Sequence, residues 1–200
     1  IEIKEGATVT VDPGQSITLR GADQMTVLGS LIAPGGHISI NDVRLDPLPF
    51  NGTANPMSVW IGEHAVLDVA GRSHVAQDRF GQRYGIVHAG GSIEIGGTLN
   101  WETGTPMPRS ELYMDRHLII RPGALLDASG TQATLDLPGR GATLVASNGG
   151  SIVLASANSL YLDGALRAAS GGAGATGGTL AVALDVAPGN AYYNKHTVTP

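Results

Sequence analysis

Hydrophobic and polar residues alternate along this chain in short runs, and glycine separates one run from the next. In Ile93-Glu94-Ile95, for example, two aliphatic residues flank a charged one, one residue after the Gly-Gly pair that ends at Gly91. Side chains of a strand point alternately to its two faces, so a period of two is typical of strands. No window keeps the spacing of a helix for long. The pattern therefore predicts strand after strand and no long helix.

The short runs recur within longer units. LIIRPGALLDASG, from Leu118 to Gly130, aligns with VWIGEHAVLDVAG, from Val59 to Gly71, at an offset of 59 residues. The Gly-Gly pairs that end at Gly91 and Gly150 keep the same offset across an intervening loop, which chance matches rarely do. VTVDPGQSITLRG, from Val9 to Gly21, and the shorter DGALRAASG are further relatives. We therefore predict about four imperfect repeats.

Three all-β architectures could hold such repeats. A propeller needs hairpins closed by tight Asn-Gly or Asp-Gly turns, whereas Pro-Gly, Gly-Gly and Ala-Ser-Gly corners separate the runs here. Corners of that kind turn a chain through part of a circle, so that one coil stacks on the next with a rise of about 4.8 Å. We predict an all-β fold, a parallel β-helix with extra-helical loops, in which Ile38, Ile93 and Ile152 occupy equivalent inward positions. A β-sandwich is the alternative.

Composition adds limits to this picture. Only 4% of the residues are aromatic, so the core must be built from aliphatic side chains in thin, regular layers. The net charge is −5 and there is no Lys/Arg cluster, so the sequence predicts no basic patch for nucleic acid or an anionic membrane. The absence of cysteine excludes disulfides, Cys-ligated zinc and thiol catalysis. The chain begins without Met or a signal segment, and we interpret it as a fragment of a longer protein.

Uneven segments between the repeats predict the domain organisation. Residues 1–189 are expected to form the β-helix segment, with loops at 41–58, 72–84 and 100–116, and residues 190–200 a tail or a link to the next unit. Insertions in a solenoid commonly carry its binding surface. Most of the scarce aromatic residues lie in or beside these three loops, which is the most informative functional feature of the sequence.

Rings beside charges suit glycan recognition, because aromatic faces stack on sugar C–H groups while Arg and carboxylates hydrogen-bond hydroxyls. The candidate ligand-binding residues are Phe50, Arg79, Phe80, Arg83, Tyr84, Trp101, Arg109 and Tyr113. An alternative is that Phe50, Trp101 and Tyr113 only pin their loops onto the shaft. A third is lateral docking onto another part of the same long protein.

Two segments resemble a known family. LIIRPGALLDASG and GGSIVLASANSLYLDGALRAASGG are similar to the passenger repeats of filamentous-haemagglutinin-like exoproteins, which two-partner systems of Gram-negative bacteria secrete. The resemblance runs discontinuously from Val9 to Leu184. It implies a right-handed β-helix, export through a partner outer-membrane barrel, and a role in adhesion or biofilms at the cell surface. The passenger of an autotransporter, which has the same kind of fold, is an alternative.

One departure from the family places the segment within the protein. The N-terminal secretion domain of the family carries an Asn-Pro-Asn motif, and the nearest match here is Asn55-Pro56-Met57. The resemblance therefore implies an internal or late piece of the shaft. Together these features predict a segment of a secreted surface adhesin that displays loops for cell, matrix or glycan contact. A passive spacer is the main alternative. We expect a monomeric shaft, with possible end-to-end contacts through exposed sheet edges.

An enzyme is a further alternative, because β-helices also carry polysaccharide-cleaving enzymes. Such enzymes need paired carboxylates or an acidic calcium cluster with a base. Instead Asp12, Asp68, Asp127 and Asp163 are scattered along the repeats, as expected of turn-forming residues. We therefore predict no catalytic residues.

Metal sites are not predicted either. His64 and Asp68, and likewise His74 and Asp78, have a spacing that would suit a metal pair on a helix. His64 and Asp68 fall in a strand-turn-strand segment, where residues four apart are well separated. The stretch SGGAGATGG resembles a calcium-binding nonapeptide but lacks its Asp. No cofactor is expected.

Overall fold

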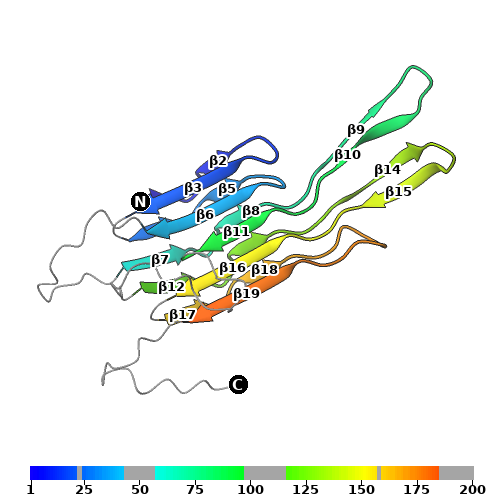
Figure 1. The fold of residues 1–200 in the computed structure, drawn as a ribbon. Coiled ribbons are helices and arrows are strands. Elements are labelled where there is room, and N and C mark those ends of the chain that lie inside the picture. Colours follow the sequence, from blue (N-terminus) through cyan, green and yellow to red (C-terminus); the bar gives the residue numbers. More distant parts are fainter. Residues whose placement is uncertain (22–23, 43–56, 97–115, 157–158, 185–200) are drawn as a thin grey trace, which may run out of the picture.

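The computed structural model describes residues 1–21, 24–42, 57–96, 116–156 and 159–184. This part of the chain is all-β, and no helix occurs in it (Figure 1). The expected loops 41–58 and 100–116 lie almost wholly outside the described residues. So do four of the candidate ligand-binding residues, namely Phe50, Trp101, Arg109 and Tyr113.

Fifteen of the described strands form three five-stranded parallel sheets. The first sheet contains β1 (Glu2–Ile3), β4 (Met25–Val27), β7 (Met57–Ile61), β12 (Arg116–Ile120) and β17 (Ser159–Leu162). The second contains β2 (Thr8–Thr10), β5 (Ser30–Ile32), β8 (Val66–Asp68), β13 (Leu125–Asp127) and β18 (Ala165–Arg167). The third contains β3 (Ser16–Gly21), β6 (His37–Asp42), β11 (Ser92–Ile95), β16 (Ser151–Ser156) and β19 (Thr179–Leu184).

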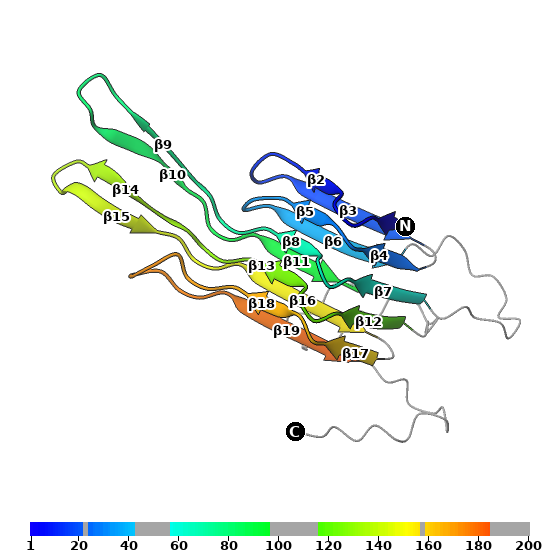
Figure 2. The same ribbon diagram turned by 180° about the vertical axis from the view of Figure 1, so that it is seen from behind.

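The chain visits the three sheets in turn, and each pass adds one strand to each sheet (Figures 1 and 2). Ile38 pairs with Ile93, and Ile93 pairs with Ile152, so the predicted equivalence of these three positions is confirmed. All three side chains are buried, at 0–1% exposure. The common offset of 59 residues is thus the sequence separation between equivalent residues of the third and fourth passes.

Aliphatic side chains from all three sheets meet in one core. In the first sheet Ile61 lies between Val27 and Ile120, and the second and third sheets contribute similar stacks. The fully buried large side chains are Met25, Leu31, Ile38, Ile40, Ile61, Leu67, Ile93, Ile95, Leu118, Ile120, Leu126 and Ile152. None of them is aromatic. Stacking equal or similar side chains in register fills such a thin core, because each pass repeats the volume of the one before.

A ladder of glycines explains the repeated Gly-Gly phrase. Gly36, Gly91, Gly150 and Gly178 stack where the chain enters the third sheet. A Cβ added to Gly91 would lie 2.0 Å from the carbonyl oxygen of Gly36, and one added to Gly150 would lie 1.8 Å from that of Gly91. Only glycine allows the backbones of successive passes to come this close. The Gly-Gly pairs are therefore a requirement of stacking.

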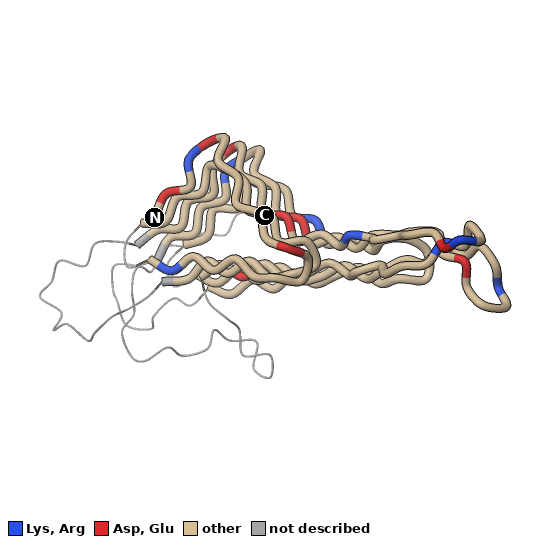
Figure 3. Tube along the Cα trace, turned by 90° about the horizontal axis from the view of Figure 1, so that it is seen from above, with Lys and Arg blue, Asp and Glu red and all other residues tan. Residues whose placement is uncertain are grey.

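Two antiparallel hairpins leave the three-sheet stack between the second and third sheets. The first hairpin consists of β9 (Ser73–Gln77) and β10 (Arg83–Val87), and the second of β14 (Gln132–Leu137) and β15 (Gly141–Ala146). Both project well beyond the stack on the same side (Figures 1 and 3). The expected loop 72–84 lies in the first hairpin. The second hairpin was not predicted from the sequence.

The register corrects part of the repeat alignment. Val9 pairs with Leu31, and Leu31 pairs with Leu67, so Val9 belongs to the second sheet. The aligned residue Val59 belongs to the first sheet, and matching Val9 to it was wrong by one strand. In the described residues the first two passes have no hairpin between the second and third sheets, which shortens them and hid their true period. Counted by strands, the described residues make five passes instead of about four repeats.

Candidate functional site

The four candidate residues within the described part of the chain all lie on the first hairpin. Phe80 is in its turn with 73% of its surface exposed, and Tyr84 lies on β10 with 58% exposed. Arg79 precedes Phe80, and its guanidinium carbon lies 4.7 Å from the ring centroid. Phe80 and Tyr84 are thus displayed to solvent, away from the core.

The turn that carries Phe80 is fixed by its own residues. Oδ1 of Asp78 accepts hydrogen bonds from the backbone N–H groups of Phe80 and Gln82, at 2.8 and 2.9 Å. Gly81 has a φ of +80°, the left-handed region that glycine enters without cost. Asp78 is therefore a turn-forming residue, and its position four residues after His74 has a structural reason.

One face of the first hairpin is exposed along its length. Tyr84 pairs with Ala76, and Ile86 pairs with His74. Cross-strand partners share a face and alternate residues point the same way, so these four side chains lie together. All four are exposed, Ile86 to 60%. We call these four residues and Phe80 the hairpin surface.

Arg83 joins the two hairpins. Its Nη2 and Nε donate to Oδ1 and Oδ2 of Asp136 on β14, at 3.1 and 3.2 Å, and its backbone N–H donates to Oδ2 at 2.7 Å. Hydrogen bonds from the side chain and the backbone of Arg83 lower the pKa of Asp136, and the carboxylate raises the pKa of Arg83. The first hairpin is thereby held against the second.

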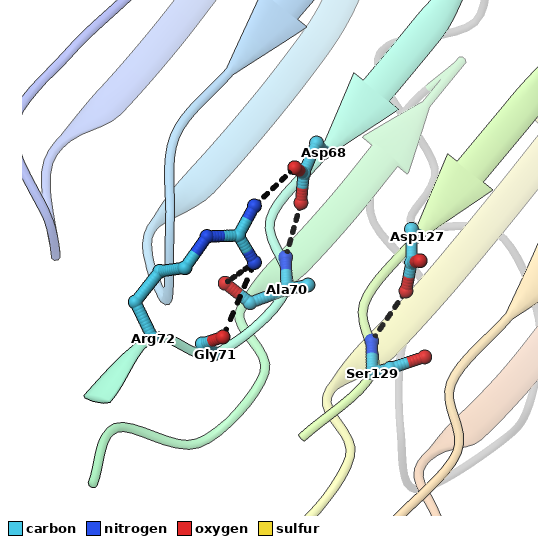
Figure 4. Close-up of polar contacts among 6 residues, drawn as sticks. All are labelled: Asp68, Ala70, Gly71, Arg72, Asp127 and Ser129. Atoms are coloured by element: carbon cyan, nitrogen blue, oxygen red, sulfur yellow. Dashed lines mark hydrogen bonds and ion pairs between the residues drawn. The ribbon is translucent and has the colours of Figure 1, made fainter. Parts of the chain in front are cut away.

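Asp68 and Asp127 are turn-forming residues as well (Figure 4). They are paired in register on β8 and β13. Each accepts a hydrogen bond from the backbone N–H two residues further on, that of Ala70 or Ser129, at 2.8 Å. Asp68 also forms an ion pair with Arg72. This confirms the interpretation of both carboxylates as polar positions beside a corner.

A second candidate site, which was not predicted from the sequence, lies at the corner between the first and second sheets. A cavity of about 300 Å³ opens there to solvent. We call it the corner cavity; it is lined by Glu5, Leu28, Trp60, Gly62, Glu63, His64 and Arg121. Charged residues mark this corner of the stack in Figure 3. Its size is at the lower end of small-molecule sites.

Trp60 and Arg121 form the polar-aromatic wall of the corner cavity. Trp60 is half-buried on β7, where an outward-facing aromatic residue is unexpected in a chain so poor in rings. The guanidinium carbon of Arg121 lies 5.4 Å from the Trp60 ring centroid. Nη2 of Arg121 donates to Glu63 at 3.1 Å. Trp60 could have been found from the sequence, because it alternates with the buried Val59 and Ile61.

In the described residues no group of three or more His, Cys, Asp and Glu side chains is placed to hold a metal ion. Nor does that part of the chain contain a helix of the length and apolarity that crossing a membrane would need. In comparisons with known proteins, no family model, no curated protein and no solved structure matches the chain.

Proposed function

We propose that this chain is a shaft segment of a secreted bacterial surface adhesin, and that the hairpin surface is one of its contact sites for cells, matrix or glycans. In this proposal the chain resembles filamentous-haemagglutinin-like exoproteins, reaches the cell surface through a partner outer-membrane barrel, and has no nucleic acid partner. The observation that carries the proposal is the display of Phe80 and Tyr84 on a hairpin that projects from the stack.

The proposed architecture is a right-handed parallel β-helix. Three parallel sheets visited in turn, in-register aliphatic stacks and a glycine ladder are the features that such a fold requires. A β-helix is rigid along its axis because every pass is hydrogen-bonded to the next. It suits a protein that must hold a contact surface away from the membrane.

The construction of the first hairpin favours display over simple spacing. A spacer needs no projecting hairpin, whereas here Asp78 and Gly81 fix a turn and Arg83 fixes the hairpin to its neighbour. The chain nonetheless leaves Phe80, Tyr84 and Ile86 mostly exposed. Large exposed apolar side chains grouped on one rigid element are typical of contact surfaces.

We propose no catalytic activity. Three of the carboxylates already have structural partners. Asp68 and Asp127 accept backbone hydrogen bonds at corners, and Asp136 accepts hydrogen bonds from Arg83. A hydrolase acting on polysaccharides would instead need two carboxyl groups free to act on one bond. The occupied carboxylates therefore favour a binding role.

The proposal is tested by binding of the chain to a broad glycan array and to whole cells. The test variant combines Phe80→Ala with Tyr84→Ala, which removes both rings of the hairpin surface. The matched control is Leu144→Ala, which removes an exposed apolar side chain from the second hairpin. Circular dichroism of all three proteins checks that the sheets form.

Binding by the parent that the double variant loses and the control keeps would support a contact site on the first hairpin. Equal binding by all three proteins would exclude the hairpin surface as the site. If the folded parent binds nothing, the spacer alternative replaces the proposal.

A further inference from the structure

The corner cavity exists because one corner of the stack is two residues shorter than its neighbours. In the first and third passes a four-residue corner closes with a hydrogen bond from Ala7 to Lys4 or from Ala65 to Gly62. In the second pass only Leu28 and Gly29 connect β4 to β5. Gly29 is level with Ala7 and with Ala65, because the next residue, Ser30, pairs with Thr8 and with Val66. The second pass therefore has no counterpart of Glu5-Gly6 or Glu63-His64.

This missing dipeptide leaves a notch one pass wide. Glu5 stands on one side and Glu63 with His64 on the other, so their backbones lie about two strand spacings apart, roughly 9.5 Å. Leu28 and Gly62 contribute to its lining, and the indole of Trp60 adds an aromatic wall. The notch follows from backbone lengths and does not depend on how any one side chain is oriented.

The lining matches the two kinds of surface that a sugar ring presents. The C–H face of a pyranose stacks on an aromatic ring, and its equatorial hydroxyls need donors and acceptors around the ring. Trp60 supplies the aromatic surface, while Glu5, Glu63, His64 and Arg121 supply both kinds of hydrogen-bonding group. A purely apolar ligand would leave these groups without partners.

A cationic ligand fits less well. Acidic residues beside an indole could suggest an ammonium group held by a cation–π contact. In this structure, however, the Arg121 guanidinium already lies over the Trp60 ring and forms an ion pair with Glu63. A second cation would compete with Arg121 for both partners. A neutral ligand can use the remaining indole surface and leave this pair intact.

We propose that the corner cavity is a binding site for a neutral pyranose sugar, held against Trp60 and hydrogen-bonded by Glu5, Glu63 and His64. The site lies on the shaft and does not involve the hairpin surface. Such a site would suit a shaft that contacts matrix polysaccharide along its side, but the proposal does not depend on the adhesin function.

The experiment measures binding of methyl glycosides of glucose, galactose, mannose and N-acetylglucosamine by saturation-transfer NMR. In the test variant, Glu-Gly is inserted between Leu28 and Gly29, which gives the second pass a four-residue corner and fills the notch. The matched control has the same insertion between Asp163 and Gly164, the short corner of the fifth pass, which does not line the cavity. Circular dichroism and thermal melting check both insertions.

A second variant keeps the test independent of the insertion. Trp60→Leu retains an apolar side chain but removes the aromatic face, and we expect about tenfold weaker sugar binding. Tyr161→Leu is its control, because Tyr161 is an exposed ring of the same sheet that neither lines the corner cavity nor belongs to the hairpin surface. Glycoside binding that is lost with Phe80→Ala and kept with Trp60→Leu would place the sugar on the hairpin surface and overturn this proposal.

The proposal expects saturable binding of at least one glycoside in the millimolar range, lost on filling the notch and weakened by Trp60→Leu. Both controls should bind as the parent does. Failure of the parent to bind any of the four glycosides would overturn it, and so would unchanged binding by a folded Trp60→Leu variant. If the parent binds choline but none of the sugars, and salt weakens this binding, the ligand is a cation and the sugar proposal is wrong.

Discussion

Arg83 and Asp136, which are 53 residues apart in sequence, connect the two hairpins. The Asp136 carboxylate accepts two hydrogen bonds from the Arg83 side chain and one from its backbone N–H. A guanidinium that meets a carboxylate with two of its nitrogens fixes both distance and orientation. The hairpins extend beyond the core of the three sheets, where β10 lies beside β14. This pair is therefore expected to set their mutual position.

The hairpin contact should depend on pH in one direction. Because folding lowers the pKa of Asp136, its stabilising contribution is fully present above the ordinary value of 3.8 and is lost as pH falls through the lower folded value. We expect lower protection factors, which correct for the pH dependence of intrinsic exchange, for β10 and β14 amides in acid and, at neutral pH, in an Asp136→Asn variant. Unchanged exchange of β11 and β16 amides is the internal control. Equal exchange of parent and variant at neutral pH would contradict the role of the pair.

The glycine ladder predicts a strong contrast between two conservative substitutions. Gly91→Ala places a Cβ 2.0 Å from a backbone oxygen that cannot move without shifting the neighbouring pass, whereas a Cβ on Gly177 would lie 3.7 Å from its nearest neighbour. We expect Gly91→Ala to lower the free energy of unfolding by about 3 kcal/mol or more. Gly177→Ala should change it by about 0.5 kcal/mol at most. Urea unfolding followed by circular dichroism measures both, and similar midpoints would rule out the ladder as a stacking requirement.

The same residue type should behave differently in the stack and on the hairpin. Ile93 is fully buried between Ile38 and Ile152, whereas Ile86 is 60% exposed on β10. Ile93→Ala is expected to cost about 2–5 kcal/mol through lost burial and the cavity left behind. Ile86→Ala should cost less than about 1 kcal/mol. Urea midpoints compare them, and a large loss with Ile86→Ala would mean that the hairpin surface is part of the core.

The sequence predicted the stacking of adjacent passes where two passes carry similar insertions. Ile93 and Ile152 were matched correctly because the same offset recurs at their Gly-Gly pairs, and in-register stacking favours similar residues at equivalent positions. Val9 was matched to the wrong strand, because the first pass is short and its runs resemble those of two different sheets. A period defined by hydrophobic alternation identifies strands but does not assign them to a sheet.

The candidate sites were predicted less completely, for a physical reason. Phe80 and Tyr84 stood out because rings are scarce, and the structure does place them on an exposed hairpin. The corner cavity depends on a two-residue difference between the corner at Leu28 and those at Glu5 and Glu63, which is visible only after the passes have been aligned. The contact between Arg83 and Asp136 depends on two hairpins projecting in parallel, and no local pattern specifies that.

The paired carboxylates of Asp68 and Asp127 provide a final prediction that separates hydrogen bonding from charge. Asp127 accepts the Ser129 N–H, and an Asn in its place keeps an acceptor oxygen while removing the like charge beside Asp68. We expect Asp127→Asn to leave the free energy of unfolding within about 0.5 kcal/mol of the parent. Asp127→Ala leaves the N–H without this acceptor and should cost about 1 kcal/mol.

Urea unfolding of the two Asp127 variants at low and high salt checks this prediction. If the hydrogen bond dominates, the alanine variant is the less stable of the two at both salt concentrations, because salt screens charges but does not replace an acceptor. Equal destabilisation by Asn and Ala would instead show that the negative charge itself stabilises the corner. The nearby Arg72, already paired with Asp68, would then have to interact with both carboxylates.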